Sequence, residues 1–234
     1  VRACASITKV MTMLLVMEAI EDGKISMKDN ITASAHAASM GGSDIWLEEG
    51  EVMSVHDLIK ATVVASANDA AVALAEEVAG SEDAFVEKMN EKAKSLGMKE
   101  TTFKNCNGLD EEGHLTSAYD VAVMSRELIK HKEIFEFTSI WMDNLRGGKT
   151  QIVNTNKLLK TYKGITGLKT GTTSQAGSCI SATAQRDGLT LVAVVLGSAS
   201  GKERFTVAAA LLDYGFANYC IYTPAFKEDI PEIS

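Results

Sequence analysis

The sequence predicts an α/β fold of the α+β type, in which an antiparallel β-sheet flanked by helices lies beside a mostly helical subdomain. Three features of the 234 residues predict it. An apolar helix opens the chain, helical patterns fill its middle, and three short apolar or alternating segments separated by turns follow near its end. A chain of this length holds one large domain or two modest subdomains with a substantial core.

The opening helix carries the first candidate catalytic pair, Ser6 and Lys9. Residues 10–20 are apolar nearly all round, so we expect a buried helix that ends near Asp22 and Gly23. Side chains three residues apart share one face of a helix, and its first turn favours negative charge. A buried lysine is pushed toward the neutral amine and can activate a serine. About one such pair arises by chance in a chain of this length, so the pair alone assigns nothing.

The middle third is predicted to be helical and contains a second polar group. Ser54 is expected to cap one helix and Ser81 another. Between these helices, Ser66 and Asn68 interrupt two apolar helical segments and have the spacing to face a shared cleft. The alternative is a simple helix break, with Asn68 or Asp69 as its cap.

A loop rich in Gly and Asp, residues 105–114, follows these helices. We interpret His114 as a histidine of this loop without a catalytic role, because Lys9 already supplies a base. Beyond the next helix, a hairpin is expected around residues 147–148.

The last third predicts an antiparallel meander of three strands, at residues 165–169, 178–185 and 189–196. The first strand carries Lys169, Thr170, Gly171 and Thr172. A cation, hydroxyls and a glycine without a side chain suit a ligand that lies along a strand edge, whereas the alternative is a surface strand with a solvated lysine. A final helix over residues 201–216 has Arg204 in its first turn. A basic residue there opposes the helix dipole, which indicates that Arg204 is kept for a ligand.

Composition excludes several functions. The net charge of −8 and the pI near 5.1 argue against nucleic acid as a partner, and no block of Lys and Arg indicates a membrane-surface patch. The four Cys and four His residues never occur at metal-ligand spacing, so neither a metal nor another cofactor is expected. The longest apolar run, residues 10–17, is too short to cross a bilayer.

Taken together, three short runs resemble a known motif set. Residues 6–9 (SITK), 66–68 (SAN) and 169–171 (KTG) are similar to the active-site motifs of penicillin-binding proteins and serine β-lactamases. With NGLD at residues 107–110, the chain is identified as a member of the low-molecular-mass D-alanyl-D-alanine carboxypeptidases over residues 2–219. The resemblance implies a β-lactamase/transpeptidase-like fold.

The resemblance also implies roles for the candidate residues. Ser6 is the acylated nucleophile, Lys9 its base, and Ser66 with Asn68 the proton-relay and substrate-contact pair. The strand from Lys169 through Thr170 and Gly171 to Thr172 binds substrate. An oxyanion hole is implied from the backbone N–H groups of Ser6 and Thr172, and Thr170 and Arg204 are candidates for the terminal carboxylate.

The implied substrate is a peptidoglycan stem peptide ending in D-Ala-D-Ala, with β-lactam antibiotics as covalent inhibitors. The implied location is extracytoplasmic, in the cell envelope, after secretion through a signal peptide upstream of Val1. We expect a catalytic domain over residues 1–219, without about two N-terminal strands usual in the family, and a linker over 220–234 toward a possible C-terminal domain. Any membrane association is expected only through segments outside this chain.

Two alternatives stay open from the sequence. A serine β-lactamase shares the acylating groups, but no ExxLN-like segment supplies the additional glutamate of the class A enzymes. A non-catalytic module that binds peptidoglycan or β-lactams need keep neither Ser6 nor Lys9, and both are present. Endopeptidase or D-aminopeptidase specificity is not separated from carboxypeptidase specificity by these motifs.

Overall fold

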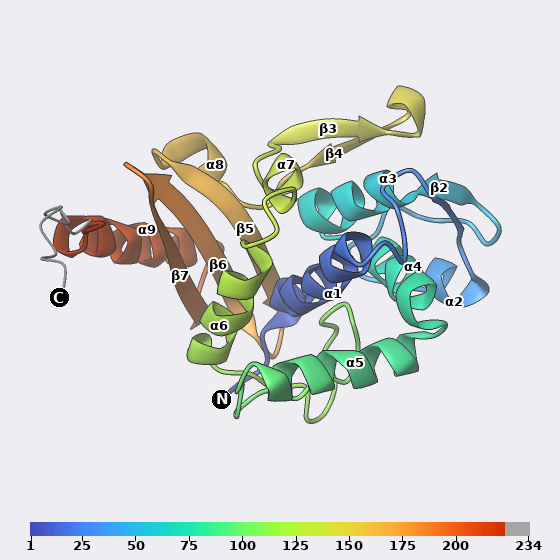
Figure 1. Ribbon diagram of the computed structural model, residues 1–234, viewed down its shortest axis with the longest axis horizontal. Helices are drawn as coiled ribbons and strands as arrows, with labels where there is room; N and C mark the ends of the chain where they lie inside the picture. The colour runs from blue at the N-terminus through green and yellow to red at the C-terminus, as the bar shows by residue number, and fades with distance from the viewer. Residues whose placement is uncertain (223–234) are drawn as a thin grey trace, which may run out of the picture.

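The computed structural model describes residues 1–222 and has the predicted α+β arrangement. A three-stranded antiparallel sheet lies on one side, a helical lobe on the other, and α1 (Lys9–Glu21) between them (Figure 1). The remaining helical segments are η1 (Ala5–Thr8), α2 (Ala35–Ala38), α3 (Val55–Lys60), the π-helix η2 (Ala61–Ala65), α4 (Asn68–Ala79), α5 (Glu82–Ser95), α6 (Ala118–Leu128), α7 (Ile134–Thr138), η3 (Arg146–Gly148), α8 (Leu158–Thr161) and α9 (Gly201–Asn218). The strands are β1 (Asn30–Thr32), β2 (Val52–Ser54), β3 (Met142–Leu145), β4 (Thr150–Val153), β5 (Ile165–Thr173), β6 (Gly177–Arg186) and β7 (Leu189–Ser198).

The central element is α1, which is buried as its apolar sequence predicts. Ten of its thirteen residues are buried, and it contacts α4, α5 and α6 as well as β5. The helix ends at Glu21 with Asp22 as its C-cap, and Gly23 follows with φ of +70°. Since both lobes pack on α1, its first turn is held rigidly where they meet.

The sheet has the order β5-β6-β7, so β6 is its middle strand. Alternate residues of β6 point to opposite faces. Ile180, Ala182 and Ala184 pack against α9, whereas the hydroxyl of Ser181 is 2.8 Å from that of Ser125 on α6. Helices therefore cover both faces of the sheet, and β5 is left as the edge strand nearest to α1.

Local signals in the sequence also predicted several element boundaries. The side chains of Ser54 and Ser81 accept hydrogen bonds from backbone N–H groups three residues later, at the starts of α3 and α5. The predicted hairpin is formed by β3 and β4, with Gly147 and Gly148 at positive φ. The first strand of the sheet, β5, spans Ile165–Thr173 and, as predicted, carries the whole Lys-Thr-Gly-Thr run.

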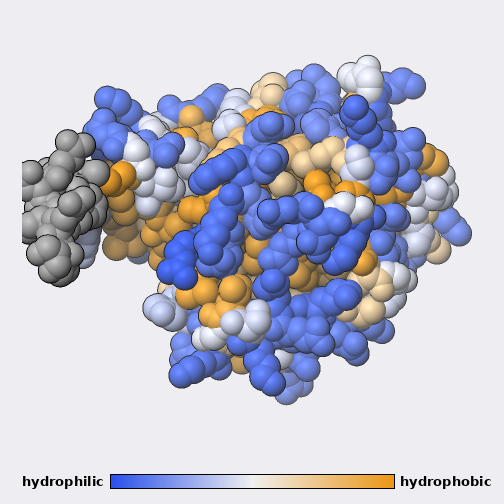
Figure 2. Space-filling model, in the orientation of Figure 1, coloured by the Kyte–Doolittle hydropathy of each residue, from blue (hydrophilic) through white to orange (hydrophobic). Residues whose placement is uncertain are grey.

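Polar residues cover most of the face drawn in Figure 2, and apolar residues are visible on the side of the sheet, where β7 is the edge strand. None of the helices within residues 1–222 has the length and apolar character needed to cross a membrane. The last helix, α9, ends at Asn218. Most of the linker predicted over residues 220–234 lies outside the described residues.

Candidate active site

The turn η1 brings the hydroxyl of Ser6 to the start of the central helix. Ser6 is half-buried, and η1 runs directly into α1. A neighbouring loop fixes this turn: a Cβ atom on Gly108 would lie 2.0 Å from the carbonyl oxygen of Ala5. Only glycine permits that approach, so the backbone next to Ser6 is held by residue 108.

Lys9 is fully buried beside Ser6 and has three polar neighbours. Its Nζ lies 3.1 Å from Oγ of Ser6, 2.6 Å from Oδ1 of Asn68 and 2.6 Å from the backbone oxygen of Asn107. Carbonyl oxygens only accept hydrogen bonds, so the two carbonyl oxygens take two N–H groups of the amine. A neutral amine has two N–H groups and one lone pair. In the neutral form the lone pair is therefore directed to the hydroxyl of Ser6, whereas the protonated amine donates to it.

Burial also favours the neutral form of this amine. Loss of hydration lowers the pKa of Lys9 to about 7, although Cys106 and Asp69 act in the opposite direction. At neutral pH a large fraction of Lys9 can then accept a proton. The arrangement is chemically suited to deprotonate Ser6 as its oxygen attacks a carbonyl carbon.

Ser66 and Asn68 lie where the helices η2 and α4 meet. Ser66 has left-handed backbone angles, with φ of +63°, directly after the π-helix. The amide of Asn68 donates to the carbonyl oxygen of Gly41 at 2.6 Å, while its oxygen accepts from Lys9. Asn68 is therefore not a helix cap. Of the two alternatives for this segment, the structure shows side chains that face a shared site.

The carboxylate of Asp69 belongs to a different group of contacts. It accepts hydrogen bonds from the backbone N–H groups of Ile45 and Leu47 and from the N–H of Ala70. Asp69 thus holds the loop before β2 against the start of α4, next to Asn68.

Lys169 enters the site from β5. It is buried, and its Nζ donates to Oγ of Ser66 at 2.9 Å and to the backbone oxygen of Thr170 at 3.0 Å. Burial lowers the pKa of Lys169 well below its ordinary value, and the charge of Arg204, with that of Lys9 when it is protonated, lowers it further. The alternative of a solvated surface lysine is thus wrong.

The rest of the Lys-Thr-Gly-Thr run follows along β5. The hydroxyl of Thr170 is hydrogen-bonded to that of Thr155, and Thr172 is exposed. Nη1 of Arg204 reaches this strand from α9. It donates to the backbone oxygen of Gly171 and the hydroxyl of Thr172, both at 2.8 Å, and to the backbone oxygen of Cys179 at 3.2 Å.

Comparison with known proteins identifies the family. A family model described as D-alanyl-D-alanine carboxypeptidase (Peptidase_S11) matches residues 1–200. The chain belongs to this family. It is 51% identical over 230 residues to the D-alanyl-D-alanine carboxypeptidase DacF of Bacillus subtilis, covering 97% of this chain and 59% of DacF. It is 37% identical over 227 residues to DacC of Escherichia coli, covering 94% of this chain and 56% of DacC. The chain thus spans little more than half the length of these relatives.

Solved structures agree with this membership. Penicillin-binding protein 6B of Escherichia coli has a TM-score of 0.87 and 39% identity, with 93% of this chain and 70% of that chain covered. Penicillin-binding protein D2 of Listeria monocytogenes, bound to ampicillin, has a TM-score of 0.82 and 32% identity, with 92% and 88% covered. The predicted fold class is confirmed.

In this carboxypeptidase family member, the structure corrects our interpretation of Gly171. We expected its missing side chain to admit a ligand to the strand edge. A Cβ atom at Gly171 would instead lie 2.8 Å from the backbone nitrogen of Ser6 and 2.9 Å from the carbonyl oxygen of Cys4. The glycine is required because β5 packs directly on η1. Its absent side chain permits an approach within the protein, and this approach places β5 beside Ser6.

Replacing Gly171 with alanine is therefore expected to separate β5 from η1 and to slow the acylation of Ser6. A misplacement of about 1 Å can cost a factor of about 10² in rate. The acylation rate constant with a penicillin measures the loss, and the melting temperature shows whether the fold persists. Gly201→Ala is the control, because a Cβ atom there meets no atom closer than 3.9 Å. Equal rates for Gly171→Ala and Gly201→Ala would contradict the prediction.

Two contributors to this candidate site were not found from the sequence. The backbone oxygen of Asn107 accepts from Lys9, and the hydroxyl of Thr155 is paired with that of Thr170. The only available signal was the NGLD run at residues 107–110, which contributed to the resemblance but suggested no role for a carbonyl group. Thr155 gave no signal.

His114 lies in the predicted loop, and it is buried. Its Nε2 is 2.8 Å from the hydroxyl of Thr8, and its Nδ1 accepts from the N–H of Lys104 at 3.2 Å. Burial lowers the pKa of His114 to about 4, so the ring is neutral near pH 7. These contacts connect the loop to η1 and do not reach Ser6.

The acylation rate is expected to rise with pH through a midpoint near 7. Only the neutral amine of Lys9 can take a proton, and the neutral fraction increases as pH passes its pKa of about 7. The second-order rate constant for reaction with a penicillin reports the free protein and is measured across neutral pH. A rate constant that does not change across this range would contradict the assignment of Lys9 as the base.

Proposed function

We propose that this protein is a serine D-Ala-D-Ala carboxypeptidase that removes the terminal D-alanine from peptidoglycan stem peptides. The observation that carries the proposal is the pair formed by the hydroxyl of Ser6 and the buried amine of Lys9, 3.1 Å apart. Family membership and the names of DacF and DacC supply the substrate class. No cofactor takes part in the proposed reaction.

In the proposed acylation step, Oγ of Ser6 bonds to the carbonyl carbon of the penultimate D-alanine, and its proton passes to Nζ of Lys9. The carbonyl oxygen becomes negative and accepts hydrogen bonds from the backbone N–H groups of Ser6 and Thr172. The C–N bond to the terminal D-alanine then breaks. Its nitrogen receives the proton that Lys9 took from Ser6, relayed through the hydroxyl of Ser66, which Lys169 holds in place. Lys9 is then neutral again.

In the proposed second step, water attacks the ester carbonyl of the acyl-enzyme. Lys9 accepts a proton from the water and returns it to the oxygen of Ser6 as the ester bond breaks. The shortened peptide leaves with a new carboxylate. Asn68 contributes by accepting a hydrogen bond from Lys9 and so holding the amine beside Ser6.

We also propose that β-lactams acylate Ser6. The β-lactam ring presents a carbonyl carbon to the same hydroxyl, and ring opening replaces loss of the terminal residue. The solved structures of penicillin-binding protein D2 of Listeria monocytogenes with ampicillin and with cefotaxime support this part of the proposal.

The decisive experiment incubates the purified protein with a synthetic peptide ending in D-Ala-D-Ala and measures free D-alanine. We expect release of one D-alanine per peptide, and no release of L-alanine from the matched peptide ending in D-Ala-L-Ala. Rapid turnover of a penicillin without D-alanine release would favour a β-lactamase. Reversible binding with neither reaction would favour a non-catalytic module, and either result would overturn the proposal.

Arg204 is proposed to assist in binding the terminal carboxylate of the substrate, together with Thr170. Its Nη1 is occupied by β5 and β6, but its buried Nε has no partner among residues 1–222. Arg204→Ala is expected to lower kcat/KM on D-Ala-D-Ala peptides by an amount on the order of 1.5 to 3 kcal/mol, as for hydrogen bonds to charged groups. Lysine should not restore it, because it lacks the planar guanidinium.

The control for this prediction is the same peptide with an amidated C-terminus. If Arg204 only held Gly171 and Thr172 in place, its loss would disturb β5 itself and would lower kcat/KM equally for both peptides. Equal losses would therefore rule out carboxylate recognition, and a larger loss with the free acid would support it.

We infer that the protein acts outside the cytoplasmic membrane, where peptidoglycan stem peptides are found, and that residues 1–219 form its catalytic domain. Immunodetection in fractionated cells tests the location. Recovery in the cytoplasmic fraction would contradict it.

A further inference from the structure

The amine of Lys9 depends on a backbone carbonyl that belongs to a loop. Asn107 accepts from Nζ of Lys9 through its backbone oxygen, so the position of this oxygen decides where one N–H group of the amine points. The position of a carbonyl group in a loop is fixed by the contacts that the neighbouring peptide groups make. The contacts of Cys106, the preceding residue, are therefore decisive.

Cys106 is held on both sides by hydrogen bonds. Its N–H donates to Oε1 of Glu82 at 3.0 Å, and its carbonyl oxygen accepts from the hydroxyl of Thr12 at 2.5 Å. Glu82 lies in the first turn of α5, and Thr12 lies one turn after Lys9 on α1. The loop is thus fastened between two helices at the residue directly before Asn107.

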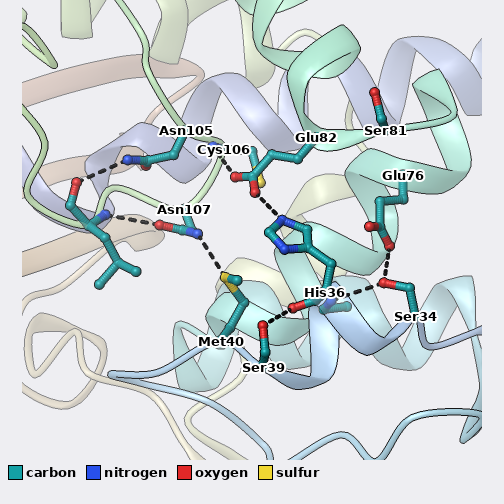
Figure 3. Close-up of polar contacts among 12 residues, drawn as sticks. Ser34, His36, Ser39, Met40, Glu76, Ser81, Glu82, Asn105, Cys106 and Asn107 are labelled. Carbon is teal, nitrogen blue, oxygen red and sulfur yellow. Dashed lines mark hydrogen bonds and ion pairs between the residues drawn. The ribbon is translucent and has the colours of Figure 1, made fainter.

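Glu82 is itself fixed by α2. Figure 3 shows the ring of His36 directed to the Glu82 carboxylate, and Nε2 of His36 lies 2.7 Å from its Oε2. Burial alone would raise the pKa of Glu82, but the hydrogen bonds from the Cys106 N–H and from His36 lower it below its ordinary value. The side chain is a carboxylate at neutral pH, and a charged acceptor makes a stronger hydrogen bond to an N–H than a neutral one does.

The end of α2 also contacts the loop. Met40 follows α2, and its sulfur lies 3.6 Å from the side-chain nitrogen of Asn107 (Figure 3). The side-chain oxygen of Asn107 accepts from the N–H of Leu109 at 2.9 Å. Both ends of the Asn107 side chain are thus engaged.

We propose that Glu82 is a positioning residue for Lys9: it holds the Cys106 N–H, and thereby the Asn107 carbonyl that orients the amine toward Ser6. The proposal rests on the proposed function, in which Lys9 is the base for Ser6. Glu82 touches neither Ser6 nor Lys9. It acts through the loop that covers them.

The structure provides a matched control. Glu76 on α4 is half-buried like Glu82, and its Oε2 accepts from the hydroxyl of Ser34 at 2.6 Å (Figure 3). This contact fastens the other end of α2 and does not reach the loop at Cys106. Removing either carboxylate therefore costs one side-chain hydrogen bond to α2 or its N-cap, but only Glu82 supports the Asn107 carbonyl.

The test compares Glu82→Ala, Glu82→Gln and Glu76→Ala in the full chain, with a penicillin as the probe. We expect Glu82→Ala to slow acylation between about tenfold and about a hundredfold, because a misplacement of about 1 Å costs up to about 10²-fold. The loss should lie in the rate constant at saturating penicillin. Glu82→Gln keeps an oxygen that accepts from Cys106 and should stay near wild type, as should Glu76→Ala.

The pH profile provides the readout that a general loss of stability would not change. Loosening the loop admits water to Lys9, and burial is the largest cause of its lowered pKa. The midpoint for Glu82→Ala should therefore move to higher pH. The other titratable groups that act on Lys9 are Lys169 on β5, Cys106 in the loop and Asp69 on α4, and none of them is substituted in these variants.

Each outcome is decisive. Equal rates in Glu82→Ala and Glu76→Ala, or a loss in Glu82→Gln as large as that in Glu82→Ala, would overturn the positioning role. An unchanged midpoint in a slowed Glu82→Ala would also overturn it. Failure of the proposed function is distinguishable, because the wild-type protein would then form no adduct at Ser6.

Discussion

Ser6→Ala is expected to abolish covalent labelling by penicillin completely. Among the hydroxyl groups of the described residues, only that of Ser6 is hydrogen-bonded to the Lys9 amine, and Ser6 lies at the start of α1. Intact-protein mass spectrometry should show one added penicillin on the wild type and none on the variant. The fold should persist, since a half-buried hydroxyl with one partner contributes about 1 kcal/mol.

Ser174→Ala is the control for this prediction. Ser174 is an exposed serine beside the end of β5, and its loss should leave the adduct unchanged. An adduct on Ser6→Ala, mapped by proteolysis to Ser66 or another residue, would show that the nucleophile has been assigned to the wrong position.

Lys9→Ala is expected to lower the acylation rate by a factor of about 10² to 10⁴, the usual cost of removing a general base. The residual reaction should also lose the inflection near neutral pH that the Lys9 pKa of about 7 produces. Stopped-flow measurement of acylation at several pH values gives both quantities. Some loss of stability is expected as well, because Asn68 and Asn107 keep buried oxygens without a donor, at about 1 to 3 kcal/mol each.

Two further variants separate chemistry from packing. Lys9→Arg fills the site with a side chain that stays charged at all accessible pH values and cannot serve as a base, so it should be as slow as Lys9→Ala. Lys28→Ala removes an exposed lysine and should react like the wild type. A Lys9→Arg variant with an unchanged rate would eliminate Lys9 as the base.

The parts of the structure that the sequence predicted are those governed by local chemistry. The spacing of Ser6 and Lys9 is a helical spacing, so their proximity follows as soon as a helix forms there. The serine caps at Ser54 and Ser81 act over three residues. The meander follows from alternation and turns, and its first strand carries the Lys-Thr-Gly-Thr run as predicted.

What could not be predicted depends on where distant segments cross. The carbonyl of Asn107 has no signature, because every residue carries one, and its role appears only when its loop crosses α1. The absent side chain of Gly171 was predicted to make room for a ligand, but η1 occupies that space. Arg204 was predicted to be kept for a ligand, and nothing in the sequence indicated that its Nη1 would donate to backbone oxygens of β5 and β6.

The position of α1 between the two lobes also has a consequence for folding. The Lys9–Asn68 contact closes a loop of moderate length, but Lys169 and Ser66 are 103 positions apart, and β5 must reach η1 near the start of the chain. Contacts between such distant positions form late, because closing long loops costs chain entropy before any contact rewards it. Reactivity toward a fluorescent penicillin should consequently appear only in the last kinetic phase of refolding, after the helical circular dichroism has recovered. The appearance of this reactivity would therefore show when the distant segments have come together.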